Sequence, residues 1–272
     1  MSEQIKLNRC GVSLDELERA AVLCLQTFAP ENGVPYYGCF SGGKDSVVIK
    51  EIARRSGVSV DWHYNVTTID QPELCKFIKR EHPDVTWEHS KHGNFFKRIL
   101  TNGFPTRRRR WCCEEYKETQ TPVGRRMIFG IRAAESPRRR NAWKQVTAHK
   151  RTGEWVINPI ISWTDDDVWS YIRSREIPYC SLYDEGFKRL GCVGCPMSTR
   201  RRADFARWPR FERLWRKAFR LLWEKRTGKL QRGGVEWFGD AKFDSWEEMF
   251  EWWISNDPLP TDDDECEGLP LV

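Results

Sequence analysis

Ser41-Gly42-Gly43-Lys44-Asp45-Ser46 lies between a short apolar run and a stretch of helical spacing, and the interpretation of the whole chain starts from this hexapeptide. Residues 34–40 are rich in strand formers, and the apolar residues that follow recur at helical spacing until Gly57. Two glycines let the backbone approach a ligand closely, and the positive end of the following helix favours an anion. Lys44 adds a mobile charge, while Ser41 and Ser46 add hydroxyl donors. The sequence therefore predicts a phosphate cradle at the end of a strand.

Strand and helix patterns alternate along most of the chain. We expect strands within residues 34–40, 58–66, 85–89, 127–131 and 155–161, and helices at 13–28, from 72 and around 95–100. This alternation predicts an α/β fold with a doubly wound, mostly parallel, Rossmann-like sheet. From Arg202 onward, aromatic residues recur at helical spacing. They predict a helical, Trp-rich C-terminal extension, in which the aromatic stripes are core or docking faces.

Composition narrows the class of protein. The chain has 272 residues, ten cysteines and a net charge of +6. This length can bury a sizeable core, and no apolar run approaches the ~20 residues that span a bilayer. Residues 1–9 lack the apolar core of an export signal, so we expect a cytoplasmic protein without a membrane partner. Cysteines in that compartment serve as thiols, metal ligands or catalytic groups rather than disulfides.

The charge is unevenly distributed. Arginines gather in three clumps, at residues 107–110, 138–140 and 200–202, whereas residues 262–272 carry acids and no Lys or Arg. Such clumps are commonly solvated surface, and they also attract nucleic acid without sequence preference. Each clump lies near a motif described below, so a role in binding an anionic ligand stays equally open.

Four cysteines have the spacing of a metal site. Cys192-Val193-Gly194-Cys195 can bring two thiolates to one metal centre from a tight loop, and Cys112-Cys113 adds an adjacent pair. An all-thiolate set suits zinc or an iron–sulfur cluster. The adjacent pair differs from the usual zinc ribbon, and the spacing by itself also allows a C-x-x-C beside unrelated buried cysteines.

The hexapeptide resembles the PP-loop of the ATP-pyrophosphatase (adenine nucleotide alpha hydrolase) superfamily. The resemblance implies binding of ATP with Mg²⁺ by residues 41–46 and cleavage between the α and β phosphates. Substrate would be adenylated and pyrophosphate released. Asp45 would then help to hold the metal-pyrophosphate, and Lys44 would neutralise charge growing on the leaving group.

Three further segments resemble the iron–sulfur reductases of 3′-phosphoadenosine 5′-phosphosulfate (PAPS), and the likeness spans about residues 35–198. The segments are the Cys-Cys segment 110–117, the GxRxxES segment 130–138 and the P-I-x-x-W segment 158–172. The resemblance implies a 4Fe-4S cluster on Cys112, Cys113, Cys192 and Cys195. Arg132 and Arg138 follow an expected strand end, where guanidinium forks can grip phosphate or sulfate, so we expect both to bind the nucleotide.

The resemblance covers two chemistries. The intact Lys44-Asp45 pair favours ATP cleavage coupled to sulfur transfer, since PAPS and adenosine 5′-phosphosulfate (APS) carry no pyrophosphate to cradle. PAPS or APS reductase is the alternative, with Cys266 in a Glu-Cys-Glu-Gly-Leu ending as the nucleophile that attacks sulfur. Neighbouring acids would raise the Cys266 pKa and weaken its thiolate. A non-catalytic subunit that binds nucleotide or nucleic acid is the third hypothesis.

Partners and domains follow from the same resemblance. A thiol or sulfur donor is implied, such as thioredoxin or a cysteine desulfurase, while nucleic acid stays open and the oligomeric state cannot be read. We expect an N-terminal helix (1–32), a PP-loop nucleotide-binding domain with the iron–sulfur site (33–200), a helical extension (201–258) and an acidic flexible tail (259–272).

Overall fold

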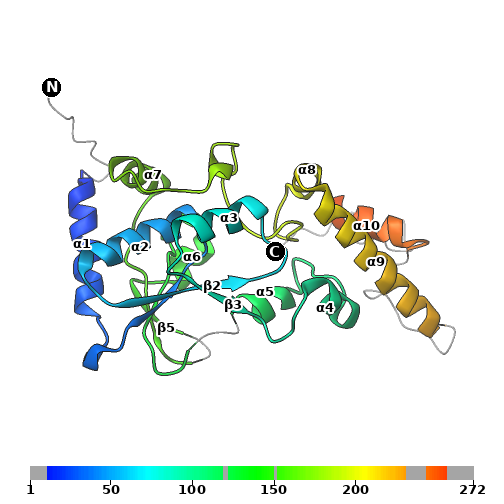
Figure 1. The fold of residues 1–272 in the computed structure, drawn as a ribbon, viewed down its shortest axis with the longest axis horizontal. Coiled ribbons are helices and arrows are strands. Elements are labelled where there is room, and N and C mark those ends of the chain that lie inside the picture. The colour runs from blue at the N-terminus through cyan, green and yellow to red at the C-terminus, as the bar shows by residue number, and fades with distance from the viewer. Residues whose placement is uncertain (1–10, 119–121, 150–151, 231–242, 256–272) are drawn as a thin grey trace. The chain divides into compact units, whose positions relative to one another are not determined.

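The computed structural model describes residues 11–118, 122–149, 152–230 and 243–255, and Figure 1 draws the chain as a ribbon. Contacts divide the chain into two compact units. We call Met1–Val66, Asp70–His89 and Glu118–Leu190 the sheet unit, and Thr67–Ile69, Ser90–Lys117 and Gly191–Val272 the helical unit. The four domains expected from the sequence stay a prediction, and the expected acidic tail lies outside the described residues.

Among the described residues, six strands form one sheet in the sheet unit. They are β1 (Tyr36–Cys39), β2 (Val60–Val66), β3 (Thr86–His89), β4 (Met127–Ile128), β5 (Val146–Ala148) and β6 (Trp155–Ile157). Their order is β3-β2-β1-β4-β6-β5, and all neighbours pair in parallel except β5, which is antiparallel to β6. The direction in which the chain adds strands reverses between β1 and β4. Ligands of open α/β sheets bind beyond the carboxyl ends of strands at such a reversal.

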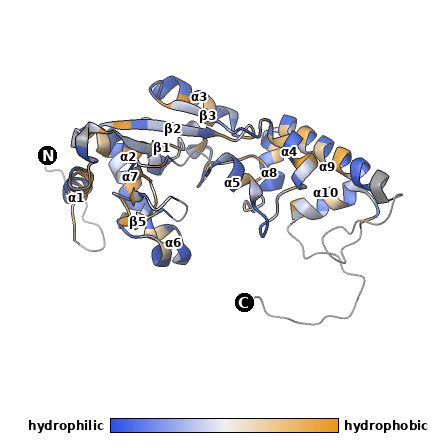
Figure 2. Ribbon diagram, turned by 90° about the horizontal axis from the view of Figure 1, so that it is seen from below, coloured by the Kyte–Doolittle hydropathy of each residue, from blue (hydrophilic) through white to orange (hydrophobic). Residues whose placement is uncertain are grey.

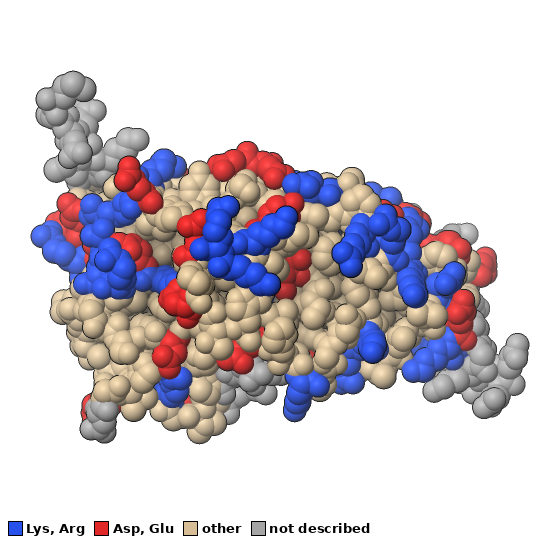
Figure 3. All heavy atoms as spheres, in the orientation of Figure 1, with Lys and Arg blue, Asp and Glu red and all other residues tan. Residues whose placement is uncertain are grey.

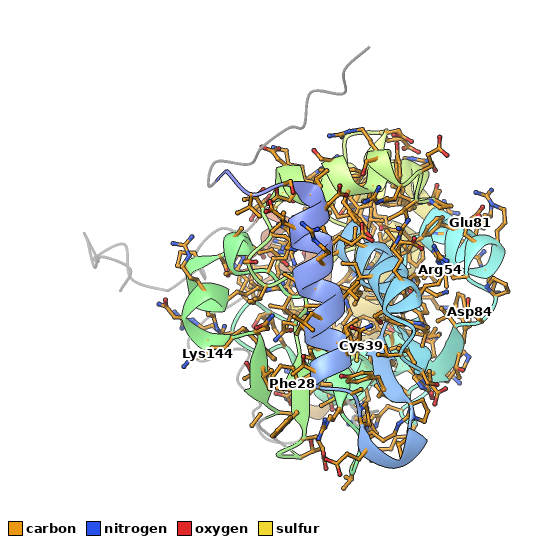
Figure 4. All side chains as sticks on the ribbon, turned by 90° about the vertical axis from the view of Figure 1, so that its left-hand side faces the viewer. Phe28, Cys39, Arg54, Glu81, Asp84 and Lys144 are labelled. Carbon is orange, nitrogen blue, oxygen red and sulfur yellow. The ribbon has the colours of Figure 1, made fainter. Side chains whose placement is uncertain are left out.

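Helices follow the strands of this unit. They are α1 (Leu14–Thr27), α2 (Lys44–Ser56), α3 (Pro72–Glu81), α6 (Pro137–Ala142) and α7 (Asp165–Ser174), with 3-10 turns η1 (Glu31–Gly33), η2 (Ala133–Glu135) and η3 (Ser181–Tyr183). Helices α1, α2 and α7 pack against one another, and Figure 4 shows α2 beside α1. Ser13 caps α1 in a capping box, and α2 ends at Gly57, whose φ of 73° is left-handed. Both helix ends were expected from the sequence and are confirmed.

The core of the sheet unit draws on β1 and α2. The buried apolar residues of α2 are Val47, Val48, Ile49, Ile52 and Ala53. Each large one contributes about 1.5–3 kcal/mol by leaving water. The Tyr36 hydroxyl of β1 donates to the Leu25 carbonyl of α1 at 2.9 Å, which ties α1 to the sheet. Gly38 lets the sheet pack closely, since a Cβ there would lie 2.3 Å from the Trp62 ring.

The helical unit is held by aromatic side chains. Its helices are α4 (Phe95–Asn102), α5 (Trp111–Tyr116), α8 (Arg201–Arg207), α9 (Pro209–Leu230) and α10 (Trp246–Ser255). Helix α9 packs against α4 and α10, and hydrophobic and hydrophilic residues alternate along it in Figure 2. Trp215 of α9 lies 5.3 Å from Phe95 and 4.6 Å from Trp253 between ring centroids. The predicted α/β fold with a helical, Trp-rich C-terminal region is confirmed.

Two surface features bear on the sequence analysis. Within the described residues, no helix combines the length and the apolar character needed to cross a membrane. Figure 3 shows groups of Lys and Arg side chains on the helical unit around α8 and α9. Arg107 to Arg110 are exposed, whereas Arg201 in the third clump is only 3% exposed. The third clump is therefore not simply solvated surface.

Candidate functional site

The predicted phosphate cradle is the turn between β1 and α2. Gly42 has a φ of +71°, and a Cβ on it would lie 2.7 Å from the side chains of Leu74 and Ile78. A side chain at residue 42 is therefore disfavoured by backbone strain and by space. Gly43 is the N-cap of α2 and supplies no capping side chain, so the amides of the first turn face the loop. The turn presents the positive end of a 13-residue helix.

Ser41 and Ser46 form hydrogen bonds within this turn. The Ser46 hydroxyl donates to the Gly43 carbonyl at 2.7 Å, and the Ser41 hydroxyl lies 3.3 Å from that of Ser46. The Gly43 amide donates to the Ser41 hydroxyl at 3.4 Å. Their predicted role as ligand donors stays a prediction, while the bonds observed here stabilise the loop conformation.

Four charged side chains meet beside the loop, and we call Lys44, Asp45, Arg132 and Asp165 the charge tetrad. Lys44 Nζ lies 3.1 Å from Asp165 Oδ1 and 3.5 Å from Asp45 Oδ2. Arg132 Nε donates to Asp45 Oδ1 at 2.5 Å, and its Nη2 donates to Asp165 Oδ1 at 2.9 Å. Two cations and two carboxylates thus alternate. The structure brings three predicted site residues together with a fourth, Asp165, that the prediction lacked.

Three elements position the tetrad. Lys44 and Asp45 open α2, Arg132 follows β4, and Asp165 is the first residue of α7. Thr164 caps α7 in a capping box, which fixes where that helix begins. Gly130 lets the segment after β4 approach α2 closely, since a Cβ there would lie 3.2 Å from the Asp45 carbonyl carbon.

Burial and charge shape the tetrad's protonation. Lys44 and Arg132 are 6% and 2% exposed, whereas the Asp165 side chain is 61% exposed. Burial acts to raise the pKa of Asp165, but Lys44 and Arg132 outweigh it, and the pKa is lowered. Burial likewise acts to lower the pKa of Arg132, and the Asp45 carboxylate more than offsets it. Asp165 and Arg132 therefore both keep their charges at neutral pH.

Arg138 lies apart from the tetrad. It is exposed on α6, and within the described ranges it has no hydrogen bond or ion pair to residues 41–46. Its neighbour Arg139 pairs with Glu135 at 2.5 Å. Arg132, which we also expect to bind the nucleotide, lies buried between two carboxylates, and its role as a ligand residue stays a prediction.

The four predicted ligand cysteines all lie in the helical unit, in two supported segments. Cys112 and Cys113 follow Trp111 in the first turn of α5, and the Trp111 indole donates to the Gly103 carbonyl at 3.2 Å. The Cys192–Cys195 turn is closed by the Cys195 amide, which donates to the Cys192 carbonyl at 3.3 Å. Trp215 Nε1 donates to the Val193 carbonyl at 3.1 Å and holds the turn against α9.

The four thiols influence one another. The pKa of Cys112 is raised by a hydrogen bond with Cys113, by burial and by the nearby Cys113, Cys192 and Cys195. Among the described residues, no three His, Cys, Asp or Glu side chains are close enough to hold one metal ion. Cys113, Cys192 and Cys195 therefore lie near enough to Cys112 to act on its thiol.

Arg201 supports the same turn. Its Nη1 donates to the carbonyls of Pro196 at 2.8 Å and Ser198 at 3.1 Å, and its guanidinium lies 5.2 Å from the Trp253 ring centre. Burial and the nearby Arg107 lower the pKa of Arg201 to about 10, so it stays charged at neutral pH. A buried cation thus lies next to the C-x-x-C segment.

The other cysteines contrast with these four. Cys39 is a strand residue, as expected, and burial raises the pKa of its thiol to about 12. Cys24 and Cys180 are buried. Cys266, the predicted nucleophile, and Cys10 lie outside the described residues.

Known proteins resemble parts of this chain. An uncharacterised protein of Methanocaldococcus jannaschii is 31% identical over 186 residues, which is 62% of this chain and 42% of the relative. A second one from that organism is 26% identical over 242 residues, covering 82% of this chain and 50% of the relative. The chain thus spans half or less of these two relatives. Adenosine 5′-phosphosulfate reductase of Staphylococcus epidermidis is 28% identical over 176 residues, covering 58% of this chain and 69% of the relative.

Structural comparison found PAPS reductase from Candida auris, with a TM-score of 0.49, 17% identity and coverage of 71% of this chain and 99% of that one. The family described as phosphoadenosine phosphosulfate reductase domain matches residues 36–198, from β1 through the C-x-x-C turn. This match covers more than half of the chain, and it includes the loop, Arg132, Asp165 and the four cysteines. The chain belongs to the phosphoadenosine phosphosulfate reductase domain family.

Proposed function

We propose that residues 41–46 bind the phosphates of an adenine nucleotide, and that ATP cleavage between the α and β phosphates is coupled to sulfur transfer. One observation carries the proposal: the buried Lys44 and Arg132 converge at the positive end of α2. Two cations and a helix N-terminus make a site suited to a highly charged anion. Asp45 beside them supplies a carboxylate, the ligand type that Mg²⁺ prefers.

The chemistry follows from this arrangement. A substrate oxygen attacks the α phosphorus, the bond from that phosphorus to the bridging oxygen breaks, and pyrophosphate leaves. Lys44 and Arg132 offset the charge that grows on pyrophosphate in the transition state. Bound Mg²⁺ would supply further charge neutralisation and orient the phosphates. A sulfur nucleophile then displaces AMP from the adenylated substrate and takes its place.

The cysteine set fits a 4Fe-4S cluster. Cys112, Cys113, Cys192 and Cys195 would hold it, since such clusters take four thiolates, one for each iron. The adjacent pair and the C-x-x-C pair supply four thiols, and Cys113, Cys192 and Cys195 all lie near enough to Cys112 to raise its pKa. A cluster there would supply structure, electrostatic stabilisation or a site for sulfur delivery.

APS or PAPS reduction is the second candidate, favoured by the relatives that bear the name adenosine 5′-phosphosulfate reductase. In that reaction a cysteine thiolate attacks the sulfur of the sulfonucleotide and releases the adenosine phosphate. A thiol donor such as thioredoxin then reduces the enzyme-bound S-sulfonate and releases sulfite. Cys266 is the candidate nucleophile from the sequence, and nucleic acid stays open as a sulfur acceptor for the first candidate.

Product analysis separates the two reactions. Anaerobic, reduced protein is assayed for pyrophosphate release from ATP in the presence of a sulfur donor, and for sulfite release from PAPS and APS. We expect pyrophosphate from ATP. Lys44→Ala should weaken ATP binding about a hundredfold, since a charged hydrogen bond contributes about 1.5–3 kcal/mol, and should abolish cleavage.

Lys50→Ala is the matched control. Lys50 lies on the same helix, and its Nζ bonds Asp84 at 2.6 Å, so its loss should leave nucleotide binding unchanged. Turnover of PAPS or APS without ATP cleavage would reverse the order of the two candidates. Equal affinities of the wild type and Lys44→Ala for ATP and PAPS would remove the loop from the proposal.

A further inference from the structure

Tyr183 lies over the loop from a distant part of the chain. Its hydroxyl accepts the Lys44 amide at 2.9 Å, across 139 positions of sequence. That amide is the first of α2 and has no carbonyl of its own helix to bond. A Cβ on Gly43 would lie 3.3 Å from the same hydroxyl, so the loop approaches the phenol closely.

The phenol is held in place from both sides. The Tyr183 amide donates to the Cys180 carbonyl at 3.1 Å, and the Gly186 amide donates to the Tyr183 carbonyl at 3.1 Å. The ring packs edge-on against Trp169, with centroids 5.0 Å apart. Turn η3 therefore aims the hydroxyl at the loop without help from a ligand.

The Tyr183 hydroxyl can also donate a hydrogen bond. A phenol that accepts one hydrogen bond can donate another through its O–H. Burial raises the pKa of Tyr183, and the nearby Asp45 and Asp165 raise it further, so the group stays protonated. It is thus a fixed, neutral donor at the place where Lys44 and the amides of α2 converge.

We propose that Tyr183 is a phosphate ligand, whose hydroxyl donates to a non-bridging oxygen of the nucleotide bound at residues 41–46. The Lys44 amide donates to the phenol oxygen and fixes its position. The phenol O–H then donates to the phosphate, so the two hydrogen bonds connect the amide to the ligand through the hydroxyl. The inference rests on the proposed nucleotide site and adds a residue from η3 to it. In the opposite role, the hydroxyl would hydrogen-bond the Lys44 amide only until phosphate displaced it from that amide. The hydroxyl would then compete with the ligand for the amide.

Tyr183→Phe removes the hydroxyl and keeps the ring, and Tyr179→Phe is its control. Tyr179 packs on the same Trp169, with centroids 5.3 Å apart, but its hydroxyl donates to Asp184 at 2.9 Å instead of bonding the loop. Calorimetric titration with ATP and with PAPS gives the affinities. Tyr183→Phe should bind the preferred nucleotide about tenfold more weakly, and Tyr179→Phe should match the wild type.

The affinities of the two variants and of the wild type decide between the possible roles of Tyr183. Unchanged affinity in Tyr183→Phe overturns the role of Tyr183 and leaves the nucleotide site standing. Tighter binding overturns it in favour of the opposite role. Equal weakening in both variants shows that loss of either hydroxyl near Trp169 has the same effect, and it also overturns the specific role of Tyr183. A wild type that binds neither nucleotide removes the proposed function itself, and the ligand role of Tyr183 with it.

Discussion

Asp165 is the member of the charge tetrad that is best placed to move. Its side chain is 61% exposed, whereas the side chains of Lys44 and Arg132 are 7% and 3% exposed. Its carboxylate lies between these two cations, 3.1 Å from Lys44 Nζ and 2.9 Å from Arg132 Nη2. We therefore infer that Asp165 competes with the phosphates for Lys44 and Arg132 as long as no metal is present.

Asp165→Asn should raise the affinity for metal-free ATP about two- to fivefold. The reason is that the substitution frees both cations from a half-exposed ion pair, which is worth roughly 1 kcal/mol or less after solvent screening. The measurement is titration of ATP in EDTA. Asp166→Asn, on the next and exposed residue of α7, removes the same charge without touching Lys44 or Arg132. An equal gain in ATP affinity in the two variants would contradict the inference, because it would show that the affinity responds only to the net charge of the surface.

At the scale of the elements, the sequence predicts well where local pattern and local chemistry agree. The strand formers of β1, the two glycines and the apolar spacing of α2 all lie within residues 34–57, and each was predicted. The aromatic stripes of α9 and α10 also fall where spacing placed them. The local sequence pattern of these elements is strong enough to determine their conformation without help from contacts elsewhere in the chain.

Helix α5 and strand β5 are among the elements that the sequence pattern did not predict. Helix α5 has six residues, and its place is set by contacts of Trp111 with Gly103 and with Phe95, whose ring lies 5.5 Å away. Strand β5 has three residues and exists through pairing with β6. Elements this short have too few residues for a periodic signal, so partners elsewhere in the chain decide their conformation.

The residues of the candidate site also divide into those that a local motif predicts and those that only the fold brings together. Lys44, Asp45 and Arg132 could be named from motifs, whereas Asp165 is brought to the site by the capped first turn of α7. Tyr183 offers no local signal, because its role depends on contact with a loop 139 positions away. Arg132 follows β4, as its position after an expected strand end predicts, while its two carboxylate partners arise from the fold alone.

Gly194 gives the C-x-x-C turn a test at this scale. Its φ is +78°, and a Cβ would lie 2.6 Å from Trp215 Nε1 and 2.9 Å from the Phe205 ring. Gly194→Ala should therefore destabilise the protein by roughly 2–4 kcal/mol, from backbone strain and overpacking. It should also lower the iron content, which we expect at about four irons per chain in brown, anaerobically purified wild type.

Gly191→Ala is the matched control, since a Cβ there meets no atom within 4 Å. Urea unfolding and iron analysis should both leave this variant close to the wild type. Stoichiometric zinc in the wild type would contradict the cluster assignment. Full iron content in Gly194→Ala would contradict the role given to the turn.

At the scale of the whole molecule, His82 should make stability depend on pH. The residue is 8% exposed and packs against Phe40 and Phe77, with centroid distances of 4.7 and 5.2 Å. Its Nδ1 lies 3.2 Å from Lys50 Nζ, and among the described residues its buried Nε2 has no hydrogen-bond partner. Burial and the Lys50 charge lower the pKa of His82 to about 4.

The sign follows from which state binds the proton. Below about pH 6.5 the unfolded chain protonates this histidine, while the folded protein keeps it neutral down to about pH 4. Stability should therefore fall as pH drops through that window, by roughly 3 kcal/mol in total at about 1.4 kcal/mol per pKa unit. Below the folded pKa both states carry the proton, and the contribution of His82 stops changing.

His82→Phe replaces the ring with one that cannot titrate between Phe40 and Phe77. Urea unfolding at pH 7 and pH 4.5 should show that the variant loses about 2–3 kcal/mol less stability than the wild type over this interval. Carboxylates also titrate there, but they do so in both proteins, so the difference between the two isolates His82. His89→Gln, at an exposed histidine in β3, should keep the wild-type slope. If His82→Phe loses as much stability on acidification as the wild type, His82 is not the group whose protonation couples folding to pH.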